Sequence, residues 1–184
     1  MNGELEVLHD VVARLEAGAF PYMLTGSVAM SVYAEPRMTR DIEIVVELAA
    51  EDALRVVELF SPDYYVSDEA VRSAISARGL FNLFNLAKLI KVDLIVKKDD
   101  AFQRQQFMRR QRHELAGCSV WVIGKEDLIL SKLVWAMPTE SAFQLRDVRK
   151  LLASGADEAY LGGWSVTLGV DVLLRKCRDE RYEP

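Results

Sequence analysis

Asp41 and Glu43 stand two positions apart in DIEIVV, residues 41–46, a segment that is otherwise apolar and β-branched. Such a composition predicts a β-strand, and in a strand the side chains at i and i+2 leave the same face. Two carboxylates side by side repel each other unless a cation joins them. We therefore interpret this pair as candidate ligands of a divalent cation.

A third acid and a glycine-containing turn extend this interpretation. Asp93 is the lone acid within KVDLIV, residues 91–96, and Gly26-Ser27 follows the apolar run YMLT at the expected start of a helix. Free backbone N–H groups at such a start favour phosphate, and carboxylate oxygens hold Mg²⁺. The combination predicts metal-assisted phosphoryl or nucleotidyl transfer. Taken singly, each acid is equally typical of a solvated residue on an open sheet face.

Periodicity and turn residues predict the elements that must position these side chains. We expect strands at 21–25, 41–46, 64–66, 80–86, 89–96 and 118–123, and helices at 4–17, 51–60, 68–77 and 99–108, with a further helix that Ser27 caps and Pro36 ends. After these come four helices at 125–136, 141–153, 157–167 and 170–178. Strands mixed with helices and followed by a run of helices predict an α+β fold, with a core over residues 1–123 and a C-terminal helical bundle over residues 124–184 packed on it.

Three segments carry a resemblance to a known family: LTGSVAMSVYAEPRMTRDIEI, FNLFNLAKLIKVDLIV and KEDLILSKLVWAMPTESAFQLRDVRKLL. In this order they resemble the nucleotidyltransferase superfamily, whose members share a polymerase-β-like core. The sequence is most similar to the bacterial branch with the AbiEii-type abortive-infection toxins and related uncharacterised proteins. The resemblance implies a mixed β-sheet with flanking helices.

The same resemblance assigns roles to the residues of the site. Gly26 and Ser27 would hold the β- and γ-phosphates of a nucleoside triphosphate, and Asp41 and Glu43 would bind Mg²⁺. Asp93 would complete a second metal site and help to deprotonate the acceptor hydroxyl. The commonest metal motif of the superfamily is Asp-x-Asp, so Glu43 is a departure that bears on activity.

Basic residues are assigned in the same way. Lys132 matches a family lysine that faces the nucleotide phosphates, and Arg40 precedes the acids closely enough to reach a triphosphate. Arg146 and Asp147 match an Arg-Asp pair of the family. The alternatives are a surface lysine for Lys132, a solvated loop for Arg40 and a charged helix face for the pair.

Composition excludes several other classes of function. A net charge of −5 over 184 residues argues against a protein that coats nucleic acid. Two histidines leave few candidates for a zinc site or a Ser-His-Asp triad, and the two cysteines match no metal-ligand spacing. A basic concentration within residues 97–112 suits RNA contact or, more simply, a solvated sheet edge. The absence of a long apolar run or a signal-peptide core predicts a cytoplasmic protein without a membrane partner.

These observations predict a Mg²⁺-dependent nucleotidyltransferase with two metal ions and a nucleoside triphosphate as substrate. It would transfer a nucleoside monophosphate to an acceptor hydroxyl on RNA, a protein or a small molecule and release pyrophosphate. The branch that it resembles implies a toxin–antitoxin component with an antitoxin-like partner. The alternatives are a weak or inactive nucleotide-binding or regulatory module of the same fold, and a structural protein whose acids are incidental.

Overall fold

A computed structural model describes residues 2–35 and 41–179, and the expected nucleotide contact Arg40 lies outside these ranges. Within them, one mixed sheet of seven strands has the order β3-β4-β5-β2-β1-β7-β6. The strands are β1 Tyr22–Thr25, β2 Ile42–Val46, β3 Tyr64–Tyr65, β4 Leu80–Asn85, β5 Ile90–Val96, β6 Gln111–Leu115 and β7 Cys118–Val122. β2 is antiparallel to β1 and parallel to β5, which is antiparallel to β4.

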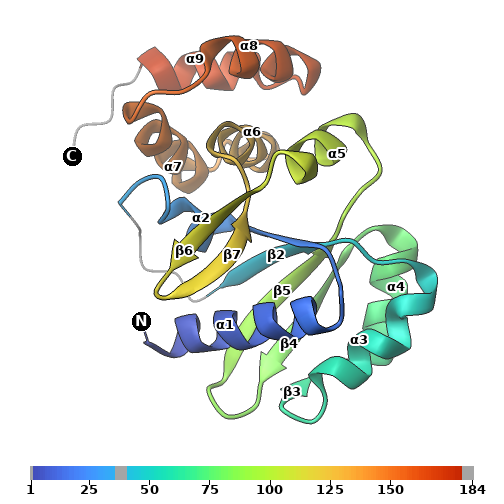
Figure 1. The fold of residues 1–184 in the computed structure, drawn as a ribbon. Helices are drawn as coiled ribbons and strands as arrows, with labels where there is room; N and C mark the ends of the chain where they lie inside the picture. The colour runs from blue at the N-terminus through green and yellow to red at the C-terminus, as the bar shows by residue number, and fades with distance from the viewer. Residues whose placement is uncertain (1, 36–40, 180–184) are drawn as a thin grey trace.

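Helices flank the sheet on several sides. They are α1 Asn2–Ala17, α2 Gly26–Met30, α3 Ala53–Phe60, α4 Asp68–Ala77, α5 Ala101–Met108, α6 Lys125–Ala136, α7 Ala142–Ala153, α8 Glu158–Thr167 and α9 Asp171–Asp179. Figure 1 shows the C-terminal helices α6 to α9 gathered at the top of the view, while α3 and α4 lie at the lower right. The predicted α+β fold with a C-terminal group of helices is confirmed.

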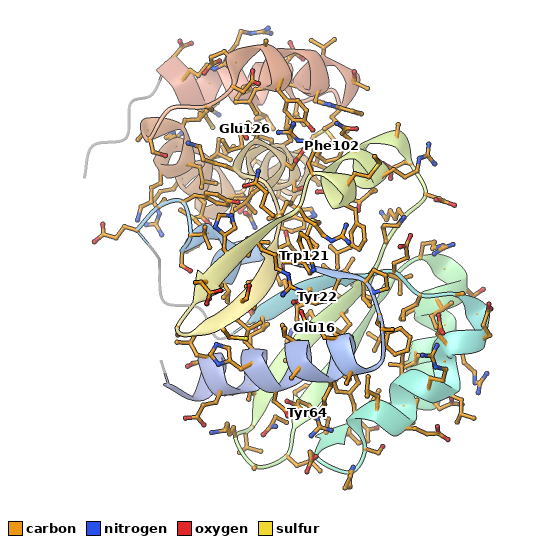
Figure 2. All side chains as sticks on the ribbon, in the orientation of Figure 1. Glu16, Tyr22, Tyr64, Phe102, Trp121 and Glu126 are labelled. Atoms are coloured by element: carbon orange, nitrogen blue, oxygen red, sulfur yellow. The ribbon has the colours of Figure 1, made fainter. Side chains whose placement is uncertain are left out.

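One face of the sheet forms the main core. Alternate positions of β2 and β5, among them Ile44 and Leu94, are fully buried there. Helix α1 covers this face, and Figure 2 shows its Glu16 beside Tyr22 of β1, whose hydroxyl donates a hydrogen bond to Glu16 Oε1 at 2.9 Å. Because side chains alternate between faces, the residues between these apolar positions must lie on the other face.

That other face is covered over β1 and β2 and open over β3 to β5. Thr25 and Val45 are buried, whereas Leu80, Phe84 and Tyr65 are 48, 42 and 63% exposed. The three exposed residues share this face because Phe84 pairs with Tyr65 in the antiparallel register and Leu80 lies four positions before Phe84. Helix α2, which contacts β1, β2 and α6, helps to cover the closed half.

The sequence-based predictions failed at two places, residues 111–115 and the helix after Gly26. Residues 111–115, which were expected in no strand, form the edge strand β6, because β7 supplies its hydrogen-bonding partner. Ser27 does not cap α2: the N-cap is Thr25, and the helix ends at Met30, well before Pro36.

None of the helices within the described ranges is long and apolar enough to cross a membrane.

Candidate active site

The three acids lie on one face of the sheet. Glu43 of β2 is directly opposite Asp93 in the parallel register with β5, so both side chains leave the same face. Asp41 precedes β2 and reaches the same side, since the ammonium of Lys91 is 3.0 Å from Asp93 Oδ2 and 3.9 Å from Asp41 Oδ1. The acids therefore stand at the border between the covered and the open half of this face.

Gly26 and Glu43 are in close contact. Gly26 has a φ of +66°, and a Cβ placed on it would lie 1.7 Å from Glu43 Oε2. The N–H of Ser27 donates a hydrogen bond to the same carboxylate. Glycine is therefore required here both for its backbone angle and for the space that Glu43 occupies. Because α2 has only five residues, the anion-binding group of the turn is this N–H rather than a helix dipole.

The environment of Glu43 disfavours its charge. Burial raises the pKa of the Glu43 carboxyl, and the nearby carboxylates of Asp93 and Asp41 raise it further. The ammonium of Lys132 and the Ser27 N–H act in the opposite direction, but burial is the largest effect. An additional cation at this position would stabilise the ionised form.

Lys132 is a buried cation with fixed partners. Its side chain is 1% exposed, and its ammonium lies 2.8 Å from Asp147 Oδ2 and 3.2 Å from Gln144 Oε1. The alternatives of a surface lysine and, for Asp147, a charged helix face are therefore wrong. Arg146 is exposed instead and lies over the ring of Phe143. Since Lys132 acts on Glu43, α6 and α7 bring a fixed positive charge to the acids.

Sequence reasoning missed two partners of Asp93. Asn82 of β4 donates a hydrogen bond to Asp93 Oδ1 at 2.5 Å, and Lys91 binds Oδ2. The two-residue spacing of Lys91 and Asp93 indicates that they share a face of the strand, and this spacing is the sequence feature from which Lys91 could have been predicted as a partner of Asp93. Nothing local indicates Asn82, because its position follows from the pairing of β4 with β5.

The donor set suits Mg²⁺, but the side chains are not gathered around one point. In the part of the chain that the structure describes, no three His, Cys, Asp or Glu side chains are grouped closely enough to hold a metal ion. Glu43 contacts the Gly26-Ser27 turn, and Lys91 lies between Asp41 and Asp93. Three carboxylates on one face are the oxygen ligands that Mg²⁺ prefers, and a metal would require these side chains to turn towards each other.

Comparison with solved structures identifies the fold. No protein-family model and no curated protein matches the chain. A nucleotidyltransferase-like protein from Paracoccidioides brasiliensis is 14% identical with a TM-score of 0.58, over 99% of this chain and 95% of that one. The antibiotic-resistance factor ANT(2'')-Ia is 14% identical with a TM-score of 0.59, over 97% and 92% of the two chains. This is the nucleotidyltransferase fold.

A third structure of this fold is the lincosamide antibiotic adenylyltransferase LnuA, solved with lincomycin. It is 16% identical with a TM-score of 0.53, over 82% of this chain and 98% of LnuA. At these identities the comparison concerns the fold, so the activity of the present chain must be argued from its own site. The resemblance to the AbiEii-type branch stays a prediction.

Proposed function

We propose that this protein is a nucleotidyltransferase that moves a nucleoside monophosphate from a nucleoside triphosphate to an acceptor hydroxyl. The register of β2 with β5 carries the proposal, because it sets Glu43 opposite Asp93 on the face that Asp41 shares. These carboxylates lie at the border of an open sheet surface, and burial together with the neighbouring acids Asp93 and Asp41 disfavours the ionised form of Glu43, which a bound cation would stabilise.

The acids would bind the metal ions, and the Gly26-Ser27 turn would bind phosphate. Asp41, Glu43 and Asp93 would hold two Mg²⁺ ions, which neutralise charge on the triphosphate and lower the pKa of the acceptor hydroxyl. When Glu43 turns away from Gly26, the N–H of Ser27 becomes available to a phosphate oxygen. The Ser27 N–H would then bind a phosphate oxygen in place of the Glu43 carboxylate oxygen that it binds in this structure.

Lys132 and Asp93 would act on the reacting groups. The buried ammonium of Lys132, held by Asp147, would offset the negative charge of the phosphates. Asp93 would take the proton of the acceptor hydroxyl as its oxygen attacks the α-phosphorus. The bond between that phosphorus and the oxygen bridging to the β-phosphate breaks, and pyrophosphate leaves. The basic side chain of Arg40 is a further candidate contact for the triphosphate.

The acceptor would approach over β3 to β5, where Leu80 and Phe84 are exposed beside Asp93. We would test small-molecule hydroxyls first, because ANT(2'')-Ia was solved with adenylyl-2''-tobramycin and LnuA with lincomycin. RNA ends and protein hydroxyls follow. A toxin–antitoxin role with an antitoxin-like partner rests on the sequence resemblance alone.

A second function has a specific observation in its favour. Lys91 pairs with two of the acids, and Glu43 accepts a hydrogen bond from the Ser27 N–H of the turn. A module that binds a nucleotide without turnover would keep the pairs of Lys91 with Asp41 and Asp93 in place of a metal, and would only exchange the Glu43 carboxylate for a phosphate oxygen at the Ser27 N–H. In that case the protein would regulate a partner according to nucleotide concentration.

Labelled triphosphates separate the two functions. The four triphosphates are incubated with Mg²⁺ and each acceptor class, and pyrophosphate and labelled acceptor are measured. Wild type and the control Asp68→Asn, which alters an exposed acid paired with Arg72 on α4, should transfer equally, whereas Asp41→Asn and Asp93→Asn should not transfer. Thermal stabilisation by triphosphate with Mg²⁺ but no transfer to any acceptor would favour the regulatory module. A melting temperature indifferent to every triphosphate would refute both.

A further inference from the structure

Lys91 lies among the acids of the candidate site. Its ammonium is 3.0 Å from Asp93 Oδ2 and 3.9 Å from Asp41 Oδ1. It is two positions before Asp93 on β5 and shares its face, so the backbone directs it to the acids. A positive side chain therefore occupies the space between two carboxylates that the proposed function assigns to a metal.

The two lysines near the acids differ in how firmly they are held. Lys132 is buried between α6 and α7, with Asp147 and Gln144 as partners. The side chain of Lys91 is 36% exposed, and it pairs with Asp93 and Asp41, which belong to the site itself. Lys132 is therefore a fixed part of the site, whereas Lys91 can swing into solvent over the open half of the sheet.

We propose that Lys91 is a built-in counter-ion that competes with the divalent cation for Asp41 and Asp93. In the metal-free protein its ammonium offsets the repulsion between the carboxylates and keeps them on one face. A divalent ion at the same carboxylates would lie within a few ångströms of the ammonium, where like charges repel strongly. Metal binding therefore entails the outward movement of Lys91.

This role rests on the proposed function, because it takes Asp41 and Asp93 as metal ligands. It also adds a specific consequence: the free protein should bind divalent metal more weakly than its three carboxylates would suggest. Removing the ammonium should strengthen metal binding by about tenfold or more, given the interaction of a divalent ion with a unit charge at roughly 4 Å. The same change should lower the melting temperature of the metal-free protein, since the carboxylates lose their counter-ion.

The test measures Mn²⁺ binding to the full chain by the loss of the free-ion electron paramagnetic resonance signal. Lys91→Gln and the nearly isosteric Lys91→Met are compared with wild type. Lys88→Gln is the matched control, because Lys88 belongs to the same β4–β5 hairpin but pairs with Glu6 of α1. We expect both Lys91 variants to bind Mn²⁺ at least about tenfold more tightly and to melt at a lower temperature without metal, while Lys88→Gln keeps the wild-type affinity.

Asp93→Asn separates the two proposals. If wild type binds Mn²⁺ through Asp93 but both Lys91 variants bind it with unchanged or weaker affinity, the metal site stands and the role of Lys91 is refuted. If neither wild type nor the Lys91 variants bind Mn²⁺, or Asp93→Asn binds it normally, the metal site itself fails and the inference fails with it.

Discussion

Replacement of Gly26 by alanine tests the contact on which the geometry of the turn depends. The residue has a φ of +66°, and the new methyl group would lie 1.7 Å from Glu43 Oε2 and 2.6 Å from its Cδ. Both atoms belong to a flexible side chain, so the chain can relieve the overlap by moving Glu43. That movement would break the hydrogen bond between the Ser27 N–H and the carboxylate.

The cost has two separable parts. A non-glycine residue in the left-handed region costs about 1–2 kcal/mol. Loss of a hydrogen bond to a charged group adds about 1.5–3 kcal/mol. Gly26→Ala should therefore lower the free energy of unfolding by about 2.5–5 kcal/mol. In a Glu43→Ala background the carboxylate is already gone, so only the backbone part, about 1–2 kcal/mol, should remain.

Urea unfolding of the four members of this double-mutant cycle measures the coupling. Gly117→Ala is the matched control, because Gly117 has a φ of +84° and open space around its would-be Cβ. It should show the backbone cost alone and no dependence on Glu43. Additive costs for Gly26→Ala and Glu43→Ala, or a Gly26→Ala cost equal to that of Gly117→Ala, would refute the close contact.

Three further predictions concern buried charges. Burial raises the pKa of the Glu43 carboxyl in the folded protein above its value of about 4.3 in the unfolded chain. Protonated Glu43 therefore contributes its full stabilisation below about pH 4.3, and this stabilisation is lost as the pH rises through the folded pKa. Glu43→Gln should remove this loss and raise the melting temperature of the metal-free protein at neutral pH; an unchanged pH profile would contradict this. Lys132→Met should cost about 3–5 kcal/mol because it leaves Asp147 charged and buried. Adding Asp147→Leu should restore most of the stability in urea unfolding but not the transfer activity. Tyr160→Phe should cost about 1–3 kcal/mol, because the Tyr160 hydroxyl donates to the buried Asp127 carboxylate at 2.5 Å; a cost no larger than that of the exposed control Tyr65→Phe would argue against it.

Local patterns in the sequence account for much of the fold. The alternation in DIEIVV and KVDLIV assigns Glu43 and Asp93 to the face opposite that of Ile44 and Leu94, because side-chain direction depends only on position along a strand. The helical period likewise predicts α6 and the three helices after it to within a residue or two. Neither pattern requires knowledge of which elements meet, and both depend on interactions within a few residues.

The tertiary structure decided the rest of the site. Only the parallel pairing of β2 with β5 sets Glu43 opposite Asp93, and only the packing of α6 on α7 turns Lys132 into a buried partner of Asp147. The strand β6 exists because β7 offers it an edge, although its own residues show no apolar face. The pairing of β2 with β5 arises from contacts between segments about 50 residues apart, so spacing within either segment contains no information about it. The residue pattern therefore identifies which acids are candidates, whereas the pairing of strands and the packing of helices set which residues surround them.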